Sequence, residues 1–213
     1  MRALAAVLLL AACAGGPPPA EWRLQSHGAL SAFEGAYLRG NARLAELEFA
    51  RARAELASTG SAELVARAEL LRCALRAASL ELDDCPGFQA LAPDAGAPER
   101  AYAAYLAGNW QGLDAALLPA PHRAVMARGD GAIPAIEDPL ARLVAAGVLF
   151  RLGRVGPAGI GAATEAAAAN GWRRPLLAWL GVQEKRAEAA GDAAAAARIR
   201  RRIELVGGAP LRR

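Results

Sequence analysis

Apolar and polar residues recur along most of this chain with the spacing of amphipathic α-helices. Near the middle, one apolar stripe at helical spacing is formed by Leu64, Ala68, Leu71, Leu75, Ala78 and Leu82, and a second by Leu70, Cys73, Ala77 and Leu80. A helix with two apolar faces packs on two sides, as in a stack of helices. The pattern, together with helix-start and helix-stop residues, predicts helices at 22–39, 42–58, 61–81, 98–107, 110–118, 139–152, 157–169, 174–190 and 192–206.

Proline and glycine interrupt this pattern in two stretches. Residues 83–97 contain two prolines and two glycines, which predicts a loop that can include one short turn. Residues 119–138 contain three prolines and two glycines and are also expected to be broken. Elsewhere, Asn41, Ser61 and Asp138 stand where a helix N-cap is expected.

Composition supports helices over strands. Hydrophobic residues make up 54% of the 213 residues, although alanine inflates that figure. Alanine has the best helix propensity, whereas the strand-favouring residues valine and isoleucine are sparse. The formal charge of +4 comes from basic and acidic residues that are mostly interspersed, which is typical of solvated helix surfaces and not of a nucleic-acid interface. We therefore expect an all-α protein that does not bind nucleic acid.

One hexapeptide is almost repeated. "AYLRGN" at Ala36–Asn41 returns as "AYLAGN" at Ala104–Asn109, a separation of two periods of about 34 residues, the length of a tetratricopeptide repeat (TPR). The first copy resembles a TPR, because Gly40 fits the turn between paired helices and Ala45, Phe49 and Ala52 follow at the offsets of the second helix. The resemblance implies antiparallel helical hairpins stacked as a short α-solenoid over residues 21–206. The alternative is an unclassified helical bundle.

Two further stretches resemble the repeat more loosely. In the second copy Gly108 again provides the turn, and Trp110 stands where TPRs often carry an aromatic residue. In a third stretch, "AGDAAAAARIRRRIEL", the turn is Gly191-Asp192 and Ala196 takes the small position, but Arg200 replaces the aromatic residue.

The N-terminus has a secretory layout. Arg2 precedes an apolar run from Ala3 to Leu10 that is too short to span a bilayer. The following "LAAC", which ends at Cys13, resembles a bacterial lipobox. This resemblance implies a signal peptide at 1–12, acylation of Cys13 and a tether at 13–20, and Ala14 indicates the outer membrane, facing the periplasm. Several acyl chains would anchor the protein stably in the bilayer. The alternative is an ordinary signal peptide with a coincidental cysteine.

Two cysteines remain beyond this segment. In an oxidising compartment two leftover cysteines usually pair, and the spacing of Cys73 and Cys85 permits a bridge if the helix that holds Cys73 stops near residues 80–82. A loop of this size would contribute roughly 3 kcal/mol. We expect a disulfide; the alternative is two free thiols.

The sequence contains little that predicts catalysis. His27 and His122 each stand alone, which is more typical of surface or capping residues than of catalytic ones, and no metal or cofactor is expected. The C-terminal arginines Arg198, Arg200, Arg201 and Arg202, followed by a basic tail at 207–213, are a solvated helix end or an anionic contact.

The expected function rests on the anchor and the repeat. We expect a non-catalytic scaffold or adaptor that binds an unidentified envelope protein or peptide. An alternative is an envelope enzyme or peptidoglycan-binding protein, for which Asp83, Asp84, Glu99 or Glu137 would have to meet a histidine or another carboxylate. A weaker alternative is a carrier of small ligands between alanine-faced helices.

Overall fold

The computed structural model of the protein describes residues 20–208. The predicted signal peptide, Cys13 and nearly all of the tether lie outside this range, as does most of the basic tail. Within the described range 77% of the residues are helical and none forms a strand, which confirms the all-α prediction.

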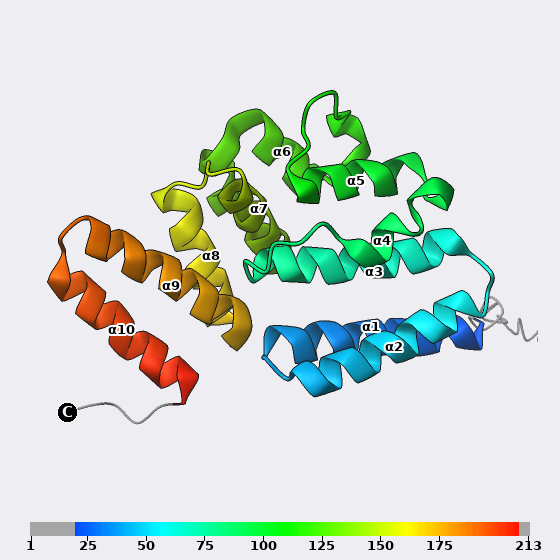
Figure 1. The fold of residues 1–213 in the computed structure, drawn as a ribbon, viewed down its shortest axis with the longest axis horizontal. Helices are drawn as coiled ribbons and strands as arrows, with labels where there is room; N and C mark the ends of the chain where they lie inside the picture. Colours follow the sequence, from blue (N-terminus) through cyan, green and yellow to red (C-terminus); the bar gives the residue numbers. More distant parts are fainter. Residues whose placement is uncertain (1–19, 209–213) are drawn as a thin grey trace, which may run out of the picture.

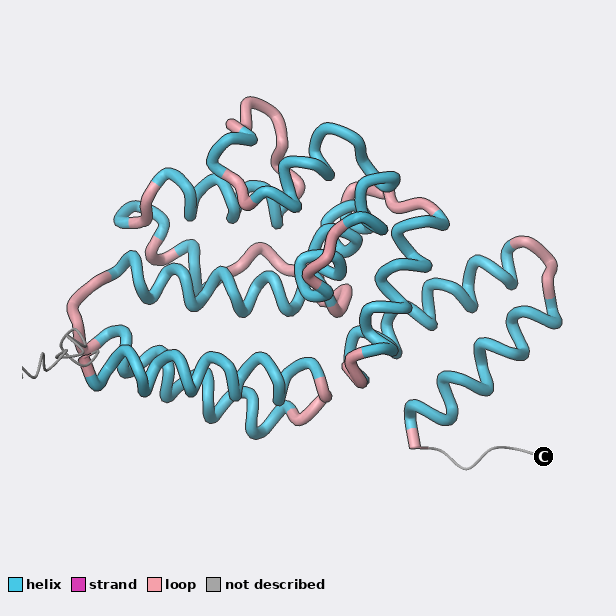
Figure 2. Tube along the Cα trace, turned by 180° about the vertical axis from the view of Figure 1, so that it is seen from behind, coloured by secondary structure: helices cyan, strands magenta, loops and turns pink. Residues whose placement is uncertain are grey.

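The chain forms ten α-helices and three short 3-10 helices over residues 20–208 (Figure 1). They are α1 Glu21–Leu38, α2 Ala42–Ala57, α3 Ala62–Ala78, α4 Pro86–Gln89, η1 Ala92–Asp94, α5 Ala97–Ala107, η2 Ala115–Leu117, α6 Ala120–Arg128, η3 Gly129–Ala135, α7 Pro139–Arg151, α8 Pro157–Ala169, α9 Arg173–Ala189 and α10 Ala193–Gly207. Helices α1 and α2 form one antiparallel hairpin, and α9 and α10 form another at the opposite end of the stack (Figure 2).

Helix α3 is the centre of the stack. Ala68 and Leu75 on one face belong to the apolar cluster shared with α1 and α2. Leu70 and Ala77 on the other face belong to the larger cluster formed with α5 and α7. Helix α3 therefore packs on two sides, as its apolar stripes predict, although Ala78 of the first stripe belongs to the larger cluster.

Helices α7 and α9 approach α3 closely near its C-terminus. A Cβ added to Gly147 of α7 would collide with the carbonyl group of Ala77, so this contact requires glycine. Trp179 of α9 is fully buried, and its indole N–H donates to the carbonyl oxygen of Ala78 at 3.0 Å. Because both partners bind the last turn of α3, that turn fixes the second half of the stack against the first.

Arg174 at the start of α9 also joins the two ends of the stack. Its Nε donates to the carbonyl oxygen of Tyr37 at 3.0 Å, and its guanidinium lies 4.3 Å from the centre of the Tyr37 ring. The same group pairs with Glu81 at 2.7 Å. One arginine therefore links the end of α1, the segment after α3 and the first turn of α9.

The repeated hexapeptide forms the same helix ending in both places. Gly40 and Gly108 have φ angles of +84° and +78°, which favour glycine. The N–H of Asn41 donates to Ala36 O, and that of Asn109 to Ala104 O, each at 2.9 Å. This is the Schellman pattern of a helix C-terminus. The hexapeptide therefore specifies how a helix stops.

The segments after the two endings differ, and here a predicted helix is wrong. Asn41 caps α2 by accepting the N–H of Leu44, and Ala45, Phe49 and Ala52 are buried on that helix. After Gly108, residues 109–114 form loop and turn, and only η2 stands where a helix at 110–118 was predicted. Gly112, with a φ angle of +72°, lies in the middle of this stretch.

The two predicted breaks contain more helix than expected. Pro119 and Pro121 stand at the N-cap and in the first turn of α6, where a missing N–H costs nothing, so they begin a helix instead of preventing one. Residues 83–97 contain the short α4 and η1. Helix α3 ends at Ala78, and the segment after it brings Cys85 to a Cα–Cα distance of 5.6 Å from Cys73. The two residues form a disulfide, as predicted.

Candidate functional site

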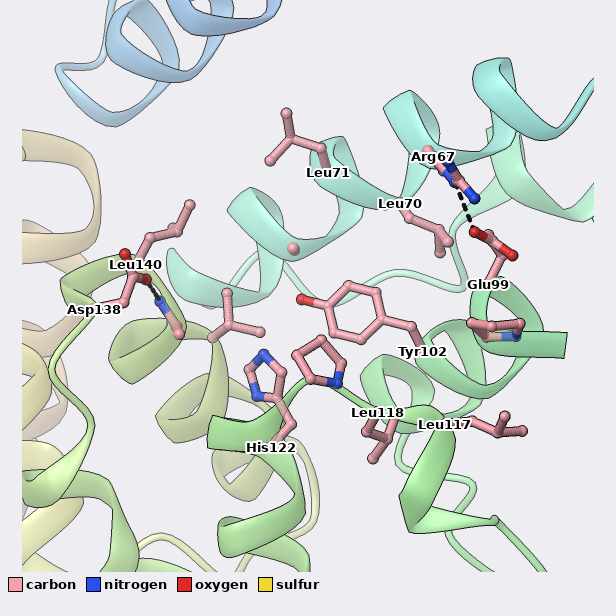
Figure 3. A pocket seen from close by; sticks show the side chains of 15 residues that line it. Arg67, Leu70, Leu71, Glu99, Tyr102, Leu117, Leu118, His122, Asp138 and Leu140 are labelled. Atoms are coloured by element: carbon pink, nitrogen blue, oxygen red, sulfur yellow. Dashed lines mark hydrogen bonds and ion pairs between the residues drawn. The ribbon is translucent and has the colours of Figure 1, made fainter. Parts of the chain in front are cut away.

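One groove of the described structure lies between α3, α5, α6 and α7 (Figure 3). Its volume is about 490 Å³, within the usual range of ligand pockets. Helix α3 lines it over three successive turns with Arg67, then Leu70 and Leu71, then Ala74. Helix α7 contributes Leu140 and Val144 from the facing side. The walls are therefore mainly aliphatic.

His122 of α6 reaches the groove from a buried position. Its side chain is only 3% exposed, and Nδ1 lies 3.2 Å from the hydroxyl of Tyr105. Burial lowers the pKa of His122 to about 4, although the charge of Asp138 acts in the opposite direction. The imidazole is therefore neutral at pH 7 and can either donate or accept a hydrogen bond.

Tyr102 supplies a second neutral polar group. Its ring lies 5.4 Å from that of His122, and its hydroxyl points toward the α7 side of the groove (Figure 3). Burial raises the pKa of Tyr102 above its ordinary value, so the phenol keeps its proton. Together Tyr102 and His122 place hydrogen-bonding groups without charge in an apolar environment.

The charged residues of the groove are already engaged. Arg67 of α3 pairs with Glu99 of α5 at 2.7 Å. Burial opposes ionisation of Glu99, but hydrogen bonds from Arg67 and from its own backbone N–H outweigh burial, and the pKa of this carboxyl is lowered. Asp138 accepts the N–H of Ala141 at 2.5 Å and caps α7. The ion pair links α3 to the first turn of α5, and Asp138 caps the start of α7.

Three of the four carboxylates singled out in the sequence do not line this groove. Asp83 pairs with Arg76 at 2.9 Å, and Asp84 and Glu137 are exposed on the surface. Of the four acidic residues singled out in the sequence, Glu99 alone shares a groove with a histidine, and it is the one held by Arg67.

The two histidines have different environments. His27 is exposed on α1, as expected for a lone histidine. The same expectation is wrong for His122, which is buried beside Tyr105 on a helix whose prolines predicted a break. Recognising Pro119 and Pro121 as a helix start would have placed His122 on a helix, but its partner would still have been unknown.

The C-terminal arginines do not act as one group. Arg200 is paired with Glu184 and Glu188 of α9, each at 2.8 Å, and so links α10 to α9. Arg198, Arg201 and Arg202 are exposed, and within residues 20–208 they form no ion pair.

Trp110, the aromatic residue singled out in the second copy of the repeat, packs on Tyr105. Its ring is stacked on that of Tyr105 with centres 5.5 Å apart, and its indole N–H donates to the carbonyl oxygen of Tyr105.

Two kinds of feature are absent from the described residues. In the part of the chain from 20 to 208, no cluster of three or more His, Cys, Asp or Glu side chains is arranged to hold a metal ion. None of the helices in that part has the length and apolar character needed to cross a membrane. Comparison of the chain with protein-family models, with curated proteins and with solved structures finds no match.

Proposed function

We propose that this protein is a lipid-anchored adaptor of the bacterial envelope that binds a segment of a partner protein in the groove between α3, α5, α6 and α7. The observation that carries the proposal is the groove itself. It combines aliphatic walls with neutral hydrogen-bonding groups on a stack of helices. Stacked helical hairpins commonly present extended binding surfaces to peptides and proteins.

The chemistry of the groove favours an apolar side chain with its neighbouring backbone. Leu70, Leu71 and Leu140 can bury an aliphatic or aromatic anchor residue of the partner. Tyr102 and neutral His122 can bond to a partner peptide group, and because neither is charged, little is lost when water leaves. The partner would therefore be a polypeptide segment with a large apolar residue.

The N-terminal pattern supports the anchor. We expect Cys13→Ser to move the protein from the membrane fraction to the soluble periplasmic fraction, whereas Ala14→Ser leaves it in the membrane. We expect Ala14→Asp to move it from the outer to the inner membrane on a density gradient. Unchanged membrane fractionation of Cys13→Ser would remove the lipoprotein proposal.

Site-specific photocrosslinking in the intact envelope tests the adaptor proposal. A photoreactive residue at Leu140 should capture one envelope protein reproducibly. The same residue at Leu47, which is 65% exposed on α2, is the control and should not capture it. Filling the groove with Ala74→Trp should abolish the product at Leu140. Equal products at both positions, or none at Leu140, would contradict the proposal.

A second candidate, an enzyme or glycan-binding protein, is favoured by one observation: His122, Tyr102 and Glu99 share the groove. It predicts that the full chain binds or cleaves purified peptidoglycan and that Tyr102→Leu abolishes this. Retention of peptidoglycan by the wild type but not by the variant, together with no crosslinked protein, would favour this candidate over the adaptor.

A further inference from the structure

A second groove runs along α9 and is separate from the one between α3, α5, α6 and α7. Its volume is about 590 Å³. One wall is the α9 stripe that contains Ala178, Gly181 and Val182, and the facing side contains Phe150 of α7 and Ile160 of α8. This groove is therefore mainly apolar and built on several helices.

Gly181 leaves part of this groove open. A Cβ added at this position would meet no atom within 4 Å, so the glycine is not required by packing against a neighbouring helix. Its absent side chain lengthens the space along the α9 stripe between Ala178 and Lys185. The open space beside Gly181 can take an acyl chain that lies along α9.

One end of this groove is positively charged. Lys185 and Arg186 line it, and both are exposed. Among residues 20–208 neither of them forms an ion pair, because the neighbouring Glu184 and Glu188 are held by Arg200 of α10. No carboxylate is among the described residues that line the groove.

Cations near a helix C-terminus also offset the helix dipole, so these two charges alone would not assign a site. The assignment rests on their position at the end of an apolar groove. That arrangement is complementary to a molecule with an apolar chain and a negative head group.

We propose that the groove along α9 binds a single-chain anionic amphiphile, with its acyl chain against Phe150, Ile160 and Val182 and its carboxylate between Lys185 and Arg186. This inference goes beyond the adaptor function and does not depend on it, because the two grooves have different lining residues.

Calorimetric titration with sodium dodecanoate, below its micelle concentration, tests the proposal. The protein is the full chain with Cys13→Ser, which keeps attached lipid out and leaves the described residues unchanged. We expect saturable binding of one dodecanoate per chain. Each methylene removed from the ligand should weaken binding about fourfold. Dodecyltrimethylammonium, with the same chain and the opposite charge, should bind at least about tenfold more weakly.

Matched variants locate the ligand. Lys185→Gln with Arg186→Gln should weaken dodecanoate binding about tenfold, while Arg201→Gln with Arg202→Gln, a pair on α10 that is also exposed, should change it less than about twofold. Gly181→Leu fills the groove and should abolish binding, and retained helical circular dichroism shows that the variant is folded. Variants of Tyr102 or Leu140 should bind dodecanoate normally.

Three results at the groove itself would overturn the proposal. They are no saturable binding by the unsubstituted groove, equal affinity for the cationic amphiphile, and unchanged affinity after removal of Lys185 and Arg186. Loss of dodecanoate binding in the Arg201 and Arg202 control would equally contradict it, because the charge would then act from α10.

Discussion

The two copies of the hexapeptide have the same local structure and different surroundings. At Gly40 the chain turns into α2, whose first turn is capped by Asn41. At Gly108 the chain continues as a loop, and the next aromatic residue, the half-buried Trp110, stacks on the ring of Tyr105. A helix stop is therefore encoded locally, whereas the start of the next helix depends on residues beyond the turn.

The largest difference between the two regions should come from their aromatic residues. Phe49 is 3% exposed and packs on Phe33 with ring centres 4.9 Å apart. We expect Phe49→Ala to lower the free energy of unfolding by about 3–5 kcal/mol. Trp110 is half-buried, so Trp110→Ala should cost about half as much. Urea unfolding measures both, and equal losses would contradict the comparison.

Acid should destabilise the fold through the region around the second hexapeptide, where His122 contacts Tyr105. Burial lowers the pKa of His122 to about 4 from an ordinary value of 6.5. Between these two values the imidazole of the unfolded chain binds a proton and that of the folded chain does not. The contribution of this residue to the free energy of unfolding should therefore fall by about 3 kcal/mol as the pH drops through that window. We expect His122→Asn to remove this part of the pH dependence and His27→Asn, at an exposed position, to leave it intact.

The shared glycines should give similar but distinguishable effects. Alanine at either position must adopt a positive φ angle, which costs about 1 kcal/mol. At Gly108 the added Cβ would also lie 2.9 Å from Cδ2 of Leu152, whereas at Gly40 it meets nothing within 4 Å. Thermal unfolding should therefore show a larger loss for Gly108→Ala than for Gly40→Ala. The reverse order would mean that the turn into α2 is more constrained than the structure indicates.

The smallest effect should separate the two asparagines. Asn41 accepts the N–H of Leu44, so Asn41→Ala should cost about 1 kcal/mol. Asn109 precedes loop residues, and Asn109→Ala should change stability by less than about 0.5 kcal/mol. Chemical denaturation of the two variants side by side measures this difference. A larger loss for Asn109→Ala would show that its side chain has a role beyond capping.

The sequence predicts features whose cause lies within a few residues. The helix stops at Gly40 and Gly108, the two apolar faces of α3 and the cysteine pair are all of this kind. The failed helix predictions also involve local features, because Gly112 has a positive φ angle within 110–118 and Pro119 and Pro121 begin α6. The missed environment of His122, in contrast, depends on residues elsewhere in the chain. His122 is buried beside Tyr105, and the groove beside it forms only where α3 and α7 lie together.

Arginine shows the same limit. Arg200, Arg198, Arg201 and Arg202 are neighbours in sequence, and the sequence alone treats them as one group. In the structure the carboxylates of Glu184 and Glu188 distinguish Arg200 from the other three. A charge run on one helix therefore cannot be divided into structural and available residues until the neighbouring helix is placed.

The hydrogen bond and ion pair of Arg174 affect the order in which the helices unfold. In an open array of repeats each unit touches only its neighbours, and unfolding can begin at either end and travel inward. Here Arg174 joins the end of α1 to the start of α9 across 137 residues of chain. Local unfolding of α1 and α2 therefore also breaks the contact with the start of α9. We expect the segment from α1 to α9 to unfold cooperatively, with α10, which lies beyond that bond, exchanging its amide hydrogens first.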